Sequence, residues 1–430
     1  MILALALPVL FLHVRYQPGF SVGFGSTRAT AYLSDIAVWA VALAALLAGL
    51  RDGFARLRGG RPLWIAGLLY LGWIGVAVAY GAARAGYSWH VHAVTAAKFA
   101  EYALLAAALP LILRRRADLE PLLVSVVVWS VVATAVGLLQ FFGLSILHAW
   151  PAGRRQPSLL GHNDFAALSG MAYAAGLVAP ALGPGGLGRR GPALVAAVAG
   201  GIGLVLAGAT AGLIGVGAAT LVLAGLGLRD GRRRGAATAI LATLVVGLGI
   251  VALRGGDYDQ FLRFVGVKPN KNSTNADVQT YSQRTLLVYI GARVFVHHPF
   301  LGVGFEGSGE YASYGPELAA ARRRFPHVAP LAFPARGRSY GVQNLYVQTL
   351  ADLGIIGAAA LVALILTGVA LAGSAALSGH AVGALALAWL LVALGLWLGQ
   401  GYVAGLPLDA ATWLALGLAA ASASWRRGRA

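Results

Sequence analysis

Arginine is the residue type in this sequence that offers the clearest chemistry. A long polar stretch, residues 254–342, holds 11 Lys and Arg residues in a chain of which only 11% is charged. A guanidinium group stays charged and presents a planar fork of donors that matches phosphate oxygens. The chain has no Cys, which excludes thiolate chemistry, disulfides and Cys-ligated metals. The available chemistry is therefore the binding of anionic groups, phosphates above all.

Two smaller patterns could also do chemistry. Lys98 and Glu101 are one helical turn apart in an apolar stretch, where ionisable groups are costly and often functional, although a local ion pair would explain them equally well. Asp257-Tyr258-Asp259 has the spacing of carboxylates that hold Mg²⁺. So short a pattern arises easily by chance, so we predict neither a metal site nor a cofactor.

The composition identifies the elements that must position these groups. Hydrophobic residues make up 58% of the chain, and several apolar runs reach 18 residues or more, which predicts an all-α integral membrane protein. The 59 Gly residues suit helices that pack closely in lipid. The formal charge of +18 could indicate a nucleic-acid partner, but the basic residues lie at the ends of apolar runs. We therefore predict membrane lipids, and no nucleic acid, as partners.

We predict a single polytopic membrane domain, residues 1–430, with about twelve transmembrane helices. The run from Met1 to Leu12 has the length of a signal peptide, but it lacks a basic start and a clear cleavage site, so we interpret it as a short first span. The other spans are predicted near residues 31–50, 62–83, 93–113, 119–143, 163–182, 192–208, 211–228, 235–253, 343–373, 380–400 and 406–424.

The distribution of charge predicts the orientation. With the N-terminus inside, the cytoplasmic loops and tail hold 16 Arg residues, whereas the short outer loops hold only Arg15, Arg28, Arg84, Arg154 and Arg155. Both termini are therefore predicted to be cytoplasmic. Residues 254–342 then form a large extracytoplasmic loop between the ninth and tenth spans.

The loop itself has a predicted internal structure. Residues 257–277 are polar and are predicted to form turns. From Ser282 to His297, Leu286, Ile290 and Val294 recur at four-residue spacing, which predicts an amphipathic helix that ends at His298-Pro299. Glycines at positions 302, 304, 307 and 309 then predict a flexible turn.

Three stretches carry a family resemblance. The first is Arg284, followed by His-Pro-Phe-Leu-Gly-Val-Gly at positions 298–304; the second is Gln343-Asn344, with Asp352-Leu353-Gly354 after it; the third is residues 155–166. Together they resemble the O-antigen ligase and O-antigen polymerase superfamily of bacterial membrane glycosyltransferases. The resemblance covers nearly the whole chain. It departs from the family in two places: the family's His is Gln343 here, and a Ser-Arg pair between two central spans looks to be Thr210-Ala211.

The resemblance implies a substrate and site residues. Proteins of this kind use a glycan on a polyprenyl diphosphate, such as undecaprenyl diphosphate, to build polysaccharides of the cell envelope. Arg155 and Arg284 are implied to bind the diphosphate, with Arg154, Arg336 and Arg338 as further candidates. Asn163, His162, Asn344, Lys98 and Glu101 are the candidates for the substrate pocket.

The identity of the catalytic base stays open. An acceptor hydroxyl that attacks an anomeric carbon benefits from a group that takes its proton, usually His. Gln343 has no useful basicity and could only orient the acceptor. His327, between Phe325-Pro326 and Pro330 in the same loop, is the nearest His in the sequence. Either His327 is the base, or the departing diphosphate makes a base unnecessary.

The function predicted from the sequence is an enzyme of the inner membrane. It would transfer or polymerise a polyprenyl-diphosphate-linked oligosaccharide on the outer face without a metal, with a glycan or lipid acceptor. Polymerisation is placed slightly ahead of ligation to a lipid or protein, because the family's His is missing. A secondary transporter remains an alternative, but the sequence shows no repeat between its halves. A scaffold or flippase partner would not need arginines grouped at one face.

Overall fold

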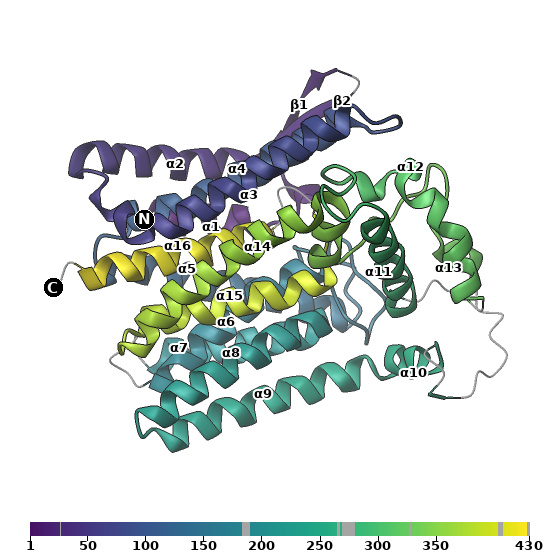
Figure 1. Ribbon diagram of the computed structural model, residues 1–430. Helices are drawn as coiled ribbons and strands as arrows, with labels where there is room; N and C mark the ends of the chain where they lie inside the picture. Colours follow the sequence, from purple (N-terminus) through teal and green to yellow (C-terminus); the bar gives the residue numbers. More distant parts are fainter. Residues whose placement is uncertain are drawn as a thin grey trace.

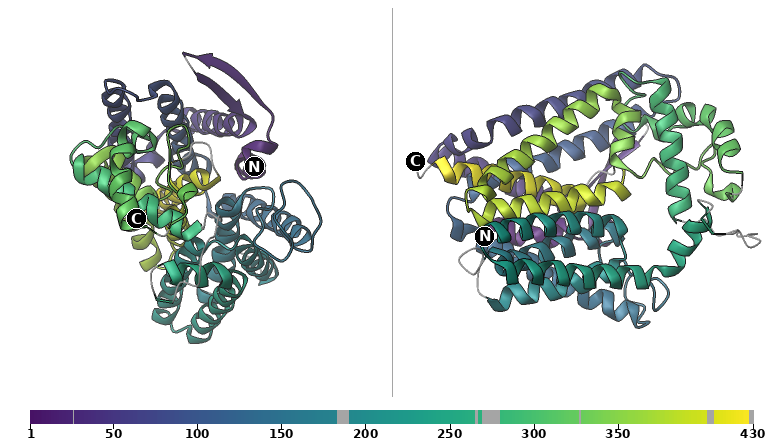
Figure 2. Two further views of the ribbon diagram at one scale, coloured as in Figure 1. Left: turned by 90° about the vertical axis from the view of Figure 1, so that its right-hand side faces the viewer. Right: turned by 60° about the horizontal axis from the view of Figure 1, so that its bottom comes forward.

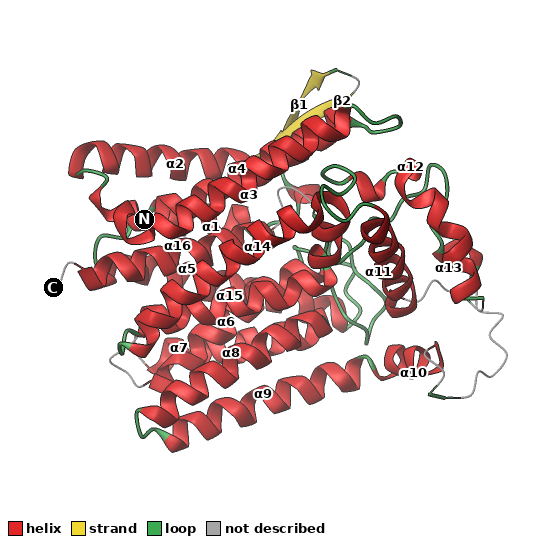
Figure 3. Ribbon diagram, viewed as in Figure 1, coloured by secondary structure: helices red, strands yellow, loops and turns green. Residues whose placement is uncertain are grey.

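The computed structural model describes residues 1–25, 27–182, 190–264, 267–268, 280–326, 328–402 and 407–427. It is a bundle of long helices with a group of shorter helices at one end (Figure 1; Figure 3). The long helices are α2 (Leu33–Asp52), α3 (Arg61–Ala82), α4 (Trp89–Ile112), α5 (Glu120–Phe141), α6 (His162–Leu182), α7 (Arg190–Ala207), α8 (Thr210–Arg229), α9 (Arg233–Leu253), α14 (Leu345–Leu377), α15 (Ala381–Leu396) and α16 (Pro407–Arg427). The shorter elements are α1 (Ile2–Leu10), α10 (Gly255–Phe264), α11 (Thr280–His297), α12 (Tyr311–Tyr314), α13 (Leu318–Arg324) and the strands β1 (Gly19–Phe24) and β2 (Thr27–Tyr32).

Ten helices among the described residues are long and apolar enough to cross a membrane. A helix lies at each of the twelve positions predicted as a span, but α1 has only nine residues and rises about 14 Å, less than half of a bilayer core. The predicted last span corresponds to α16, which is not one of the ten. The protein is thus an all-α membrane protein with ten candidate spans, and the number twelve stays a prediction.

The bundle has central and peripheral helices. Most of α6 and α15 is buried, 78% and 83% of their apolar windows, whereas the other candidate spans bury between 28% and 44%. Helix α16 is buried along nearly its whole length and packs against α4, α14 and α15. Outer helices that turn one face away from the bundle are expected for a protein whose surroundings are lipid chains.

The described part of the segment from residue 254 to residue 342 lies at one end of the bundle. Helices α10 to α13 gather there, and both chain ends lie toward the opposite end (Figure 1; Figure 2, left, shows the α10–α13 end from the front). Helix α11 occupies the stretch predicted to be helical, and Leu286, Ile290 and Val294 are buried. The prediction of turns from residue 257 is wrong for residues 257–264, which belong to α10. The predicted turns at residues 269–277 lie outside the described residues.

The antiparallel hairpin of β1 and β2 was not predicted. Phe20, Val22 and Phe24 of β1 are exposed, and Phe24 packs edge-on against Trp89 and His90 at the start of α4. The hairpin lies at the α10–α13 end, beside α4 (Figure 1). The alternation of β1 between apolar and small residues is only six residues long, too short to stand out beside the adjacent apolar runs.

The glycine-rich stretch after α11 is fixed in place rather than flexible. Helix α14 is broken at Gly354, which has φ 64°, and the chain from Pro299 to Gly304 packs into the break. The amides of Val303 and Gly304 donate to the carbonyls of Ala351 and Asp352 (both 3.0 Å), and the amide of Ile355 donates to Pro299 (2.8 Å). A Cβ on Gly354 would lie 2.1 Å from the carbonyl oxygen of Phe300, so only glycine fits.

Candidate active site at the arginine-rich end of the bundle

Segments that are far apart in the sequence meet at the turn between α7 and α8. Gly208 forms this turn with φ 59°. A Cβ on Gly208 would lie 3.0 Å from Cβ of Arg155 and 3.3 Å from Cδ of Arg254. Arg155 comes from the loop before α6 and Arg254 directly follows α9, so the glycine is the point against which both arginines pack.

Arg254 is a residue of the site that the sequence did not predict. Its side chain is only 4% exposed. Nη1 donates to the carbonyl of Gly208 at 2.8 Å, Nε and Nη2 lie 2.8 and 2.7 Å from Oδ2 of Asp257, and the guanidinium lies 4.6 Å from the ring centre of Tyr281. Through these contacts, Arg254 connects α9, α10, α11 and the α7–α8 turn and holds these segments together.

The hydroxyl groups of Tyr258 and Tyr281 connect α10 and α11 to the same turn. Oγ1 of Thr210 lies 2.8 Å from the hydroxyl of Tyr258 and 2.6 Å from that of Tyr281, and the two rings stack with centres 5.6 Å apart. Thr210 is at the position where the resemblance implied Ser-Arg, so this turn binds to α10 and α11 through a hydroxyl.

Arg155 is held by an aromatic ring instead of a carboxylate. Its guanidinium carbon lies 4.4 Å from the ring centre of Trp150. Among the residues that the structure describes, no carboxylate forms an ion pair with Arg155. Burial, and next the nearby charge of Arg254, lower the pKa of Arg155 to about 10. The positive charge of Arg155 is therefore held at an electrostatic cost.

Arg284, on α11, resembles Arg155 in being largely buried without a carboxylate partner among the described residues. Its Nε donates to Oε1 of Gln343 at 3.2 Å, and a Cβ on Gly399 would lie 3.0 Å from its Nη1. No described carboxylate forms an ion pair with it either. Burial, followed by the charge of Arg254, lowers the pKa of Arg284. Two arginines predicted from the sequence thus lie beside the same third arginine, and neither is neutralised.

Asn163 and His162, at the start of α6, are also at this place. Nδ2 of Asn163 donates to the carbonyl of Gly399 at 3.1 Å and to Oε1 of Gln400 at 2.7 Å. The ring of His162 lies edge-on to Trp150, with centres 4.4 Å apart, and its Nε2 has no hydrogen-bond partner among the described residues. Trp150 therefore contacts both His162 and Arg155.

Gln343 and Asn344 join the site to α14. Gln343 has a left-handed backbone, φ 49°. Its side chain accepts the hydrogen bond from Arg284, which places it beside the three arginines Arg155, Arg254 and Arg284. Asn344 caps α14, because its Oδ1 accepts from the amide of Val347 at 3.0 Å, and its Nδ2 donates to the carbonyl of Leu398 at 3.0 Å. The side-chain amides of Asn163 and Asn344 thus both bind residues 398–400.

Other predicted residues have different surroundings. Arg154 is exposed, Arg336 lies 5.4 Å from the ring centre of Tyr311, and Arg338 donates to the carbonyl of Phe333 at 3.3 Å. His327 lies outside the described residues.

Lys98 and Glu101 do not form a pair with each other. Nζ of Lys98 lies 2.7 Å from Oδ2 of Asp35, and Glu101 accepts a hydrogen bond from Trp39. Both partners belong to α2. Lys98 and Glu101 therefore lie at the α2–α4 interface, and Nζ of Lys98 also lies 4.8 Å from the ring centre of Tyr32 at the end of β2.

The carboxylates of the Asp-x-Asp pattern are engaged by cations. Asp257 pairs with Arg254, and Asp259 pairs with Arg263 at 2.8 Å and Lys268 at 2.5 Å. Within the described residues, no group of three His, Asp or Glu side chains is arranged to hold a metal ion.

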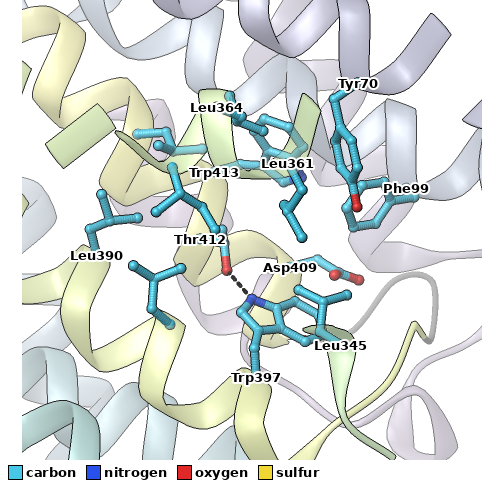
Figure 4. Close-up of a pocket in the computed structure, with 13 residues that line it drawn as sticks. Tyr70, Phe99, Leu345, Leu361, Leu364, Leu390, Trp397, Asp409, Thr412 and Trp413 are labelled. Carbon is cyan, nitrogen blue, oxygen red and sulfur yellow. Dashed lines mark hydrogen bonds between the residues drawn. The ribbon is translucent and has the colours of Figure 1, made fainter. Parts of the chain in front are cut away.

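A small cavity lies in the bundle interior, and no arginine lines it (Figure 4 shows its lining residues). Its volume of about 30 Å³ leaves room for one or two water molecules. Apolar side chains such as Leu361, Leu364 and Phe99 line most of it, and Trp397 donates to Thr412 at 2.9 Å at its edge. None of the site residues predicted from the sequence lines it, so the cavity belongs to the packing of the core.

The fold and this site together define a multi-pass α-helical membrane protein with three arginines, Arg155, Arg254 and Arg284, grouped at one end of its bundle. The family model described as O-antigen ligase matches residues 195–362. The match covers less than half of the chain. Over that part the chain is similar to the O-antigen ligase family, and together with the many apolar helices this similarity supports a multi-pass membrane protein with a glycan-transfer function of the O-antigen ligase or polymerase kind. No match was found among the curated proteins. The matched region contains Arg254, Arg284 and Gln343, while Arg155, Asn163 and His162 precede it.

Proposed function

We propose that this protein is a glycosyltransferase that polymerises or transfers a polyprenyl-diphosphate-linked oligosaccharide on the outer face of the inner membrane. The observation that carries the proposal is the pair Arg155 and Arg284, both without a carboxylate partner among the described residues and both with a pKa lowered by burial and by Arg254. An anion placed between them would relieve this repulsion. A diphosphate has the charge and the oxygen geometry that guanidinium forks recognise.

The same arginines would assist the chemistry. In the proposed reaction, an acceptor hydroxyl forms a bond to the anomeric carbon, and the bond from that carbon to the diphosphate oxygen breaks. The polyprenyl diphosphate leaves with the bonding electrons, so negative charge develops on its oxygens. A positive charge stabilises this negative charge most when it is already in position before the reaction. Trp150 and the α7–α8 turn hold Arg155 in such a position.

The proton of the acceptor hydroxyl requires a destination. Gln343 contacts Arg284, and its amide can orient an acceptor but has no useful basicity. We keep His327 as the proposed base, with direct transfer toward the departing diphosphate as the alternative. We also propose that the reaction needs no metal, because the arginines supply the positive charge that a metal would otherwise provide.

The distribution of charge supports the outer face. The α7–α8 turn, α10 and α11, which hold or contact the three arginines, lie at the end of the bundle opposite both chain ends (Figure 1), and the basic loops near residues 51–61, 114–116 and 229–234 connect the helices at the other end. Such loops are retained on the cytoplasmic side. The donor's diphosphate would then meet the arginines at the outer surface.

Ligation to a lipid or protein acceptor is the second candidate, and the description of the matching family model favours it. We place polymerisation first because Gln343 stands where the family's His is expected.

The test is to supply purified, lipid-reconstituted protein with a polyprenyl-diphosphate-linked oligosaccharide, with and without candidate acceptors. A ladder of lengthening glycans supports polymerisation, and a single adduct on an added acceptor supports ligation. Movement of the donor across the membrane without transfer would contradict both and support a transporter.

A further inference from the structure

A long apolar groove runs along the outside of the bundle between α5, α6, α7 and α9. Its volume is about 1480 Å³, more than a compact small molecule requires. Lining residues occur along α7 from Arg190 to Leu206 and along α9 from Arg234 to Leu253. A helix of this length rises about 27 Å, close to the thickness of a bilayer core. The shape therefore suits an extended chain.

The two ends of the groove differ in charge. At one end, Arg190, Arg232 and Arg234 line the groove. At the other end the lining is apolar, with Phe142, Leu206 and Leu253. Arg254, which follows Leu253, does not line the groove, because its guanidinium is bound to Asp257 and to the Gly208 carbonyl.

The basic end has no acidic partner within the described structure. None of Arg190, Arg232 and Arg234 forms an ion pair with a described carboxylate. Asp230 is the acidic residue of the α8–α9 turn, and it lines a different hollow together with Arg229. Three exposed guanidinium groups at the mouth of an apolar groove are thus available for an anion that carries an apolar chain.

Two polar side chains line the remainder of the groove, and both are bound within the protein. The hydroxyl of Tyr173 shares a hydrogen bond of 3.0 Å with Thr243, and the hydroxyl of Thr238 donates to the carbonyl of Arg234 at 2.9 Å. Leu194 and Leu241, on the walls formed by α7 and α9, are 65% and 64% exposed. Exposed leucines on these walls would pack against acyl chains, and the guanidinium groups would lie at the level of the headgroups.

We propose that this groove is a specific site for an anionic phospholipid. Its phosphate lies among Arg190, Arg232 and Arg234, and an acyl chain lies along α7 and α9. Basic pockets between transmembrane helices bind anionic headgroups in this way. The site is at the end of the bundle opposite Arg155 and Arg284, so the inference does not depend on the proposed glycan transfer.

The test is native mass spectrometry of protein released from nanodiscs that contain equal amounts of phosphatidylglycerol and phosphatidylcholine. We expect phosphatidylglycerol to be retained preferentially, and retention to fall about tenfold or more in the double variant Arg232→Gln/Arg234→Gln. Arg233→Gln is the matched control, because Arg233 lies between the two in the sequence, is exposed and does not line the groove. Equal losses in the control would indicate general surface charge and overturn the proposal.

Two tryptophan variants test whether the lipid occupies the groove. Leu241→Trp fills the groove, whereas Leu244→Trp changes an exposed residue of α9 that does not line it. Only Leu241→Trp should reduce phosphatidylglycerol retention, with thermal unfolding showing that both variants are folded. Equal retention of phosphatidylcholine by the wild type would overturn the proposal. Displacement of the bound lipid by added polyprenyl phosphate would assign the groove to the donor's chain instead and also overturn it.

Discussion

Replacing Arg155 with Gln should affect binding and stability in opposite directions. Burial and the charge of Arg254 lower the pKa of Arg155 to about 10, which corresponds to about 3 kcal/mol for holding the charged form. The cost applies at any pH below about 10, and so at neutral pH. Solvent screening of a partly exposed group reduces it to about 1–2 kcal/mol, and the lost contact with Trp150 offsets about 0.5–1 kcal/mol. We therefore expect unliganded Arg155→Gln to be as stable as the wild type, or up to about 1.5 kcal/mol more stable.

The assay is thermal unfolding in detergent, with and without inorganic diphosphate. At a concentration ten times its dissociation constant, diphosphate should stabilise the wild type by about 1.4 kcal/mol, and Arg155→Gln should lose most of this gain. Arg323→Gln is the control, because Arg323 is an exposed residue of α13 and should respond to diphosphate as the wild type does.

Arg254→Gln should behave differently from Arg155→Gln. Arg254 is buried and bound to Asp257 and Gly208, so its loss should destabilise the protein by about 2–4 kcal/mol. If Arg155→Gln destabilised the protein as strongly, Arg155 would be a structural residue. If the variant kept its response to diphosphate, Arg155 would not bind diphosphate, and either result would refute the reasoning.

Three further predictions concern the fork, the orientation and the loop. Arg284→Lys keeps the charge but loses the planar fork, so glycan transfer should fall at least about tenfold in a variant that unfolds at the wild-type temperature; full activity would mean that the fork is not used. Because the chain has no Cys, a membrane-impermeant maleimide applied to intact cells should label Ser339→Cys and not Asp230→Cys, and the reverse would invert the predicted orientation. Hydrogen bonding to His92 lowers the pKa of Glu310, so the stability that Glu310 contributes is present above the usual Glu pKa and is lost as the pH falls through the lowered value. The free energy of unfolding of Glu310→Gln should therefore change less with pH on the acid side than that of the wild type. The same pH dependence in both proteins would contradict this.

The long helices could be predicted because each is an apolar run that ends in charged or turn residues. Leu286, Ile290 and Val294 likewise revealed the buried face of α11 through their four-residue spacing. Periodicity indicates that a helix exists and which face it buries. It does not indicate which distant segment covers that face.

The partners within the site could not be predicted for this reason. Arg254 was recognised only as the boundary of the polar segment, and its role depends on Gly208 and Tyr281, which precede and follow it by many residues. Its position directly after an apolar span is the one available signal, since an arginine there must either face headgroups or be bound by protein. Lys98 shows the same limitation, because its partner Asp35 lies on another helix rather than one turn away.

The turn after α11 shows how a local pattern can mislead. Closely spaced glycines usually indicate flexibility. Here Gly302 and Gly354 are needed because two backbones approach closely: a Cβ on Gly302 would lie 2.3 Å from the carbonyl of Asp352. The contact joins two of the stretches that carried the family resemblance, and it positions the start of α14 beside Arg284.

The central claim is that Arg155 and Arg284 hold the diphosphate of a glycan donor while the glycan leaves it. The most direct test is ³¹P NMR of a polyprenyl-diphosphate-linked oligosaccharide incubated with reconstituted protein and acceptor, because transfer converts a diphosphate diester into a monoester. We predict conversion by the wild type and almost none by the folded double variant Arg155→Gln/Arg284→Gln. Equal conversion by the two proteins, or none by the wild type under conditions in which it binds the donor, would contradict the claim.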